Sequence, residues 1–150
     1  MNIKKLLLIF FILGLTSCGY EAIYFKNQKF NVSISDIKME GDKKINKKII
    51  SFLNLSKNNN SNRIKLKLNS SKKIEPISKD KMGDPSIYRM TIVVYFELSN
   101  GDRSLKKKKF SSNFVYNNIK KKFDLSEYQK SIELNLIEKI SEEILIFLNS

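Results

Sequence analysis

Few side chains in this 150-residue sequence are suited to covalent or acid–base chemistry, because it contains one cysteine, Cys18, and no histidine or tryptophan. Without histidine there is no imidazole base and no histidine-containing metal site. A single cysteine can form neither an internal disulfide nor a cysteine cluster. The carboxylates are scattered and belong to no recognisable catalytic motif. We therefore expect a protein that is not an enzyme and that needs no cofactor and no metal.

The residues around Cys18 predict that its thiol is modified after export. Lys4 and Lys5 precede an apolar run from Leu6 to Leu15, which is the layout of a secretory signal. The run is too short to cross a hydrocarbon core of roughly 30 Å, which needs about 20 residues. Leu15-Thr16-Ser17-Cys18 resembles the bacterial lipobox, in which a peptidase cuts before a lipid-bearing cysteine. The alternative is an ordinary signal peptide with a cysteine there by chance.

If the lipobox resemblance holds, residues 1–17 are a cleaved signal peptide and Cys18 is the lipidation site. Several acyl chains on one cysteine would hold the protein permanently on a membrane, since one chain alone anchors only reversibly. Residues 18–29 show no sustained hydrophobic period and suit a lipidated tether, which leaves 30–150 as a single domain. Gly19 stands where Asp would retain some lipoproteins in the inner membrane. We therefore expect an outer-membrane, periplasm-facing protein.

Hydrophobic periodicity in residues 30–62 predicts one strand and one helix. Phe30, Val32 and Ile34 alternate with polar residues and predict a strand over about 30–38. After Gly41-Asp42, apolar residues recur at three- to four-residue steps, which predicts a helix over about 43–55 with Asp42 as its cap. The polar residues 57–62 predict a loop.

The second half of the sequence predicts three strands and a long helix. A strand starts at Ile64 and is expected to end at Pro76, and residues 88–98 alternate clearly. Asn100-Gly101 predicts a tight turn into an antiparallel strand from Arg103 to Tyr116. Beyond it, an amphipathic helix of about 23 residues runs to the C-terminus, with Asp124 or Ser126 as candidate caps. These elements give an α+β fold: a four-stranded mixed sheet with two helices on one face, in the order β-α-β-β-β-α.

Charge is distributed unevenly over these elements. The whole chain carries a formal +13, which favours an anionic partner, although lysine abundance can also reflect a biased genome. Residues 57–109 hold fourteen basic and five acidic residues, whereas 124–150 hold two and six. We expect the basic segment to contact the partner. The candidate contacts are Arg89, Arg103, Lys106, Lys107, Lys108 and Lys109, although the four lysines could equally protect a sheet edge.

Several short motifs, in this order, resemble the lipopolysaccharide-assembly lipoprotein family LptE. They are Cys18-Gly19-Tyr20-Glu21-Ala22-Ile23-Tyr24, the strand Tyr88 to Leu98 ahead of an Asn-Gly turn, and Phe114-Val115-Tyr116-Asn117 before the terminal helix. The resemblance implies a lipoprotein that assists assembly of a large outer-membrane β-barrel, plugs it, and helps deliver lipopolysaccharide to the outer leaflet. Lipopolysaccharide, the barrel and the membrane, through the lipid anchor, would then be its partners.

Two other functions are compatible with the residues. A structural envelope lipoprotein could bind peptidoglycan or a different barrel. A nucleic-acid-binding module is suggested by basic strands that carry Tyr95, Phe110, Phe114 and Tyr116, because such aromatics can stack on bases. Export to the envelope argues against nucleic acid as a partner.

Overall fold

The computed structural model describes residues 34–55, 57 and 64–150. Its elements are β1 (Asp36–Gly41), α2 (Lys43–Phe52), β2 (Ile64–Lys79), β3 (Pro85–Asn100), β4 (Arg103–Asn117) and α3 (Lys122–Asn149). The order β-α-β-β-β-α predicted from the sequence is therefore confirmed. The predicted signal peptide, the tether and Cys18 lie outside the described residues.

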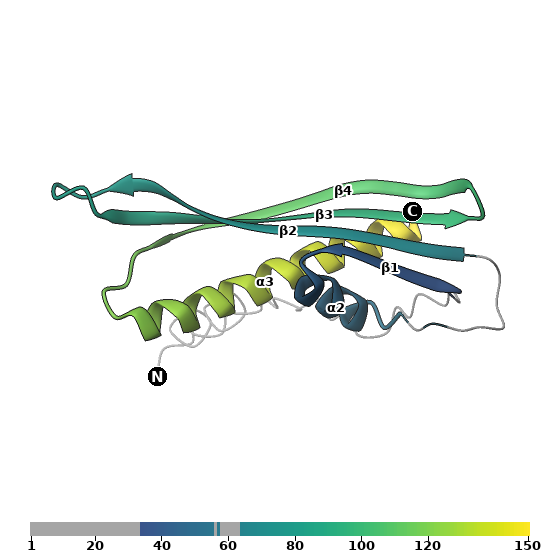
Figure 1. The fold of residues 1–150 in the computed structure, drawn as a ribbon, viewed down its shortest axis with the longest axis horizontal. Helices are drawn as coiled ribbons and strands as arrows, with labels where there is room; N and C mark the ends of the chain where they lie inside the picture. Colours follow the sequence, from purple (N-terminus) through teal and green to yellow (C-terminus); the bar gives the residue numbers. More distant parts are fainter. Residues whose placement is uncertain (1–33, 56, 58–63) are drawn as a thin grey trace, which may run out of the picture.

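The four strands form one mixed sheet in the order β1-β2-β3-β4. β1 pairs parallel with β2, as expected for two strands that are joined by a crossover helix, and the remaining pairs are antiparallel. β2, β3 and β4 are long, so the sheet is an elongated, twisted ribbon (Figure 1). Both helices lie on the same face of this ribbon, with α3 running along its length.

Local signals explain how α2 starts and how it joins the sheet. Asp42 precedes the helix, and its side chain accepts hydrogen bonds from the backbone N–H groups of Lys44 and Ile45, as predicted. Asn46 in the first turn is fully buried and donates from Nδ2 to the carbonyl oxygen of Glu40 at 2.7 Å. This bond fixes the helix against the end of β1.

The core lies between the helix-covered face of the sheet and the two helices. Alternate residues of β3 from Met90 to Leu98 are buried on this face, and Phe96 and Phe110 are among its largest fully buried side chains. α2 contributes Ile45 and Ile49 to the same cluster. The buried apolar residues, which alternate along the strands and recur every three to four residues along the helices, therefore pack against each other in one core layer between the sheet and the helices.

The structure changes several predicted boundaries. β1 runs from Asp36 to Gly41, three residues beyond the predicted end at 38, and Ile34 lies outside it in an isolated bridge to Lys57. Residues 30–33 of the predicted strand lie outside the described residues. β2 passes through Pro76 and continues to Lys79, with register shifts on either side of Ser78. α3 starts after Lys121, which makes no side-chain capping bond, so neither proposed cap of this helix was correct.

Candidate functional site

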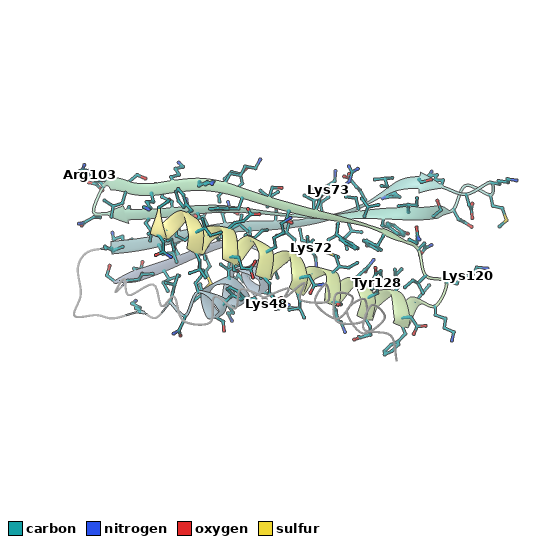
Figure 2. The ribbon with its side chains drawn as sticks, turned by 180° about the vertical axis from the view of Figure 1, so that it is seen from behind. Lys48, Lys72, Lys73, Arg103, Lys120 and Tyr128 are labelled. Carbon is teal, nitrogen blue, oxygen red and sulfur yellow. The ribbon has the colours of Figure 1, made fainter. Side chains whose placement is uncertain are left out.

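The face of the sheet opposite the helices is the candidate binding surface, and we call it the open face. Strand register assigns to it every second residue of each strand. Apart from the irregularly paired strand ends, where Lys79 and Arg103 lie, its charged residues comprise seven basic and four acidic side chains. The basic ones are Lys38, Lys65, Lys67, Lys73, Arg89, Lys107 and Lys109, and the acidic ones are Asp36, Glu40, Glu75 and Glu97. In Figure 2, Lys73 lies on the side of the sheet away from α3, whereas the neighbouring Lys72 lies toward that helix.

The four consecutive lysines of β4 are divided between the two faces because the side chains of a strand alternate. Lys106 donates from Nζ to the carbonyl oxygens of Phe147 and Leu148, at 2.9 and 3.0 Å, and so holds the end of α3. The ammonium of Lys108 lies 5.2 Å from the ring centroids of both Phe110 and Phe147. These two lysines contact the domain's own helix side.

The other two lysines of the block lie on the open face. Lys107 Nζ is 3.9 Å from a carboxylate oxygen of Glu97, and its side chain is largely exposed. Lys109 Nζ lies 5.5 Å from the centroid of the Tyr95 ring. An anion that approaches the open face would therefore meet Lys107 and Lys109, together with a half-exposed aromatic ring.

The two arginines proposed from the sequence do not converge with each other. Arg89 lies opposite Glu75 and Val115 in the sheet, in the half of β3 next to the β2–β3 turn. Arg103 pairs with Asn100 beside the β3–β4 turn, at one end of the molecule (Figure 2). Positions 89 and 100 of β3 are eleven residue steps apart, which is roughly 37 Å at 3.4 Å per residue. The proposed contacts therefore form an extended surface and not one compact pocket.

Sequence reasoning did not single out the open-face lysines of β1 and β2. Lys65 and Lys67 alternate strictly with Leu66 and Leu68, a signal that placed them on the solvent side of a strand. What the sequence could not provide is the sheet order, which sets these lysines beside Lys38 of β1. The pairing of β1 with β2 thus widens the basic surface beyond strands β3 and β4.

Carboxylates on the open face hold several of its lysines in ion pairs. Lys38 Nζ and Lys67 Nζ lie 3.0 and 3.3 Å from the same oxygen of Glu40. The hydrogen bond from Lys38, with a further one from Lys67, lowers the pKa of Glu40. The hydrogen bond from Lys73 likewise lowers the pKa of Glu75. The open face is therefore a network of alternating charge with an excess of lysine, and a bound anion would compete with these half-buried carboxylates.

Within residues 34–55, 57 and 64–150, no group of three or more cysteine or acidic side chains is arranged to hold a metal ion. Across the same residues, neither helix is both long and apolar enough to cross a membrane.

Comparison with known proteins shows that this fold occurs in other solved structures. No protein-family model matches the chain, and neither does any curated protein. Among solved structures, rare lipoprotein B from Shewanella oneidensis is similar over 73% of this chain and 90% of its own, with a TM-score of 0.56 and 13% identity. The chain shares its fold with this bacterial lipoprotein.

Two further lipoproteins share this fold. A minor lipoprotein from Acinetobacter baumannii is similar over 79% of this chain and 93% of its own, with a TM-score of 0.57 and 8% identity. Lipoprotein B from Nitrosomonas europaea is similar over 76% and 81%, with a TM-score of 0.55 and 6% identity. At these identities the likeness concerns the backbone and says nothing about individual side chains.

Proposed function

We propose that this chain is a non-catalytic outer-membrane lipoprotein, anchored through Cys18 and facing the periplasm. In this proposal it assists assembly of a lipopolysaccharide-exporting β-barrel, plugs that barrel, and helps deliver lipopolysaccharide to the outer leaflet. The observation that carries the proposal is the fold, shared with bacterial lipoproteins over about three quarters of the chain. The lipobox-like residues before Cys18 are independent support from the sequence.

The open face supplies a physical mechanism for binding lipopolysaccharide. Phosphate and carboxylate groups accept charge-assisted hydrogen bonds from lysine and arginine. Lys65 and Lys109 make no ion pair with a carboxylate among the described residues, so binding there breaks no such pair. The spread of basic groups along the sheet suits a large polyanion better than a small one. Arg89, Lys107 and Lys109 are the contacts that we propose on β3 and β4.

Two experiments test the anchoring and the partner. Cys18→Ala should abolish incorporation of labelled fatty acid, and continued incorporation would contradict lipidation at this residue. Purification of the lipidated protein from membranes should co-elute an outer-membrane β-barrel in stoichiometric amount. Recovery of peptidoglycan fragments without a barrel would instead favour a structural envelope lipoprotein.

The division of the lysine block allows a sharper test of ligand binding. Lys107→Gln with Lys109→Gln removes two open-face charges and leaves Lys106 and Lys108 on the helix side. This double variant should bind purified lipopolysaccharide more weakly at low salt, and the difference should shrink as salt screens the charges. Lys106→Gln with Lys108→Gln is the matched control, because it removes the same charge from the other face. Equal loss in both variants, with both folded, would contradict the open-face assignment.

A further inference from the structure

Two exposed segments meet at one end of the elongated domain, which we call the distal end. It comprises the β2–β3 turn, residues 80–84, with its flanking strand ends, and the β4–α3 connection with the first residues of α3. Asn118 joins them, since its backbone N–H donates to the carbonyl of Ser86 and its side-chain Nδ2 to the carbonyl of Pro85, both at 2.8 Å. Figure 1 shows the turn and the start of α3 at the same end of the ribbon, and Figure 2 places Lys120 there.

The distal end carries the two most exposed large apolar side chains of the described residues. Met82 in the β2–β3 turn is 86% exposed, and Phe123 at the start of α3 is 75% exposed. Ile77, near the end of β2, is also exposed. Each of the two segments therefore presents an apolar side chain outward at its tip.

Lysines flank both apolar tips. They are Lys79, Lys81, Lys120, Lys121 and Lys122. None of the five forms an ion pair with a carboxylate among the described residues, whereas most lysines of the open face are paired. Their ammonium groups are thus available to an external anion without loss of an ion pair within the described part of the chain.

The acidic residues at this end are fewer, and one of them stabilises the turn. Asp84 and Asp124 accompany Asp80, so the five lysines leave a basic excess. Asp80 Oδ1 accepts hydrogen bonds from the backbone N–H groups of Met82 and Asp84, each at 2.9 Å. The carboxylate is engaged with the backbone of the turn, and it holds the backbone beside Met82 in one conformation.

We infer that the distal end contacts an anionic phospholipid surface. Apolar side chains that project between lysines are the usual composition of an interfacial membrane contact, in which the side chain enters the headgroup region and the ammonium groups approach lipid phosphates. A second copy of the chain is a poorer occupant, because it would bring two basic ends together. The contact would orient the ribbon with its β2–β3 turn toward the membrane and Arg103 away from it. This inference does not rest on lipopolysaccharide binding or on a barrel partner.

The experiment uses tryptophan as a local probe, because the chain contains none. Met82→Trp and Phe123→Trp are each introduced into the full chain and mixed with vesicles of equal parts phosphatidylcholine and phosphatidylglycerol. Emission at both positions should shift to shorter wavelength, and bromine-labelled acyl chains should quench it. Ile146→Trp, at an exposed position in the last turns of α3 at the other end of that helix, is the matched control and should show neither effect.

Charge variants separate lipid contact from non-specific adsorption. In the Phe123→Trp background, replacement of Lys120, Lys121 and Lys122 by Gln should remove most of the quenching, as should vesicles of phosphatidylcholine alone. Absence of quenching at position 82 or at position 123 in the anionic vesicles would overturn the inference, because both segments must reach the same surface. Quenching at position 146 equal to that at the distal positions would overturn it as well. Failure of the barrel co-purification would leave these readouts unaffected.

Discussion

Lys106, the first of the four consecutive lysines on edge strand β4, donates a hydrogen bond of 3.0 Å to the carbonyl oxygen of Leu148 at the end of α3. The last four carbonyls of a helix have no partner within the helix and carry partial negative charge. An ammonium group at this place therefore satisfies hydrogen-bond acceptors and complements the helix dipole. A lysine that the sequence suggested for ligand binding thus joins the sheet to its longest helix.

Lys106→Met should destabilise the domain, because it keeps an apolar stem and removes the donor to both carbonyls. The expected loss in free energy of unfolding is about 1–2 kcal/mol, measured by urea denaturation. Lys107→Met is the matched control on the adjacent, open-face position, where we expect a change within about 0.5 kcal/mol. An equal effect at the two positions would show that the helix-end contact contributes nothing of its own.

Glu133 should contribute a pH-dependent part of the stability, because it links three elements. Its carboxylate accepts hydrogen bonds from Lys72 of β2 and Lys48 of α2. Burial opposes the charged form, but these two hydrogen bonds outweigh it and lower the pKa of Glu133 below its ordinary value of 4.5. A carboxyl whose pKa is lower in the folded state takes up fewer protons there than in the unfolded chain. The contribution is therefore complete above pH 4.5 and is lost as the pH falls through the folded-state value.

Glu133→Gln tests this link through the acid limb of the stability profile. The variant should be less stable than wild type near neutral pH, by about 1–2 kcal/mol, and the two profiles should converge as the pH falls below 4.5. Glu127→Gln is the control, because the ion pair of Glu127 within the described part of the chain is with Lys130 on the exposed surface of α3. Parallel profiles for wild type and Glu133→Gln down to low pH would refute the pH-linked contribution.

Gly41→Ala should destabilise the domain strongly, because β1 ends against β2 without space for a side chain. Gly41 has φ +70, and an added Cβ would lie 2.0 Å from the carbonyl oxygen of Ser70. The combined steric clash and left-handed strain should cost about 3 kcal/mol or more. Gly101→Ala is the control, since Gly101 also has positive φ but the added Cβ meets no atom of the described residues within 4 Å, so about 1 kcal/mol is expected. Thermal or urea unfolding of both variants separates the clash from the strain.

Local rules were enough to predict most of the element order from the sequence. Alternation of apolar residues predicted β3, and Asn100-Gly101 predicted its hairpin with β4, which the pairing of Ser99 with Ser104 confirms. Asp42 as cap and the spacing of Ile45 and Ile49 located α2. These features depend on residues only a few positions apart, so their physical cause is contained in the sequence itself.

Only the tertiary structure decided where the strands end and on which face of the sheet each lysine lies. Pro76 was expected to end its strand, yet β2 continues, because β1 pairs only with residues 65–70 and leaves that side of β2 unpaired beyond Ser70 among the described residues. A proline without an N–H donor is tolerated on such an edge. Alternation divides Lys106–Lys109 into two pairs, but which pair meets α3 depends on the packing of a helix that lies about forty residues further along the chain. That choice results from long-range burial, which no local sequence pattern contains.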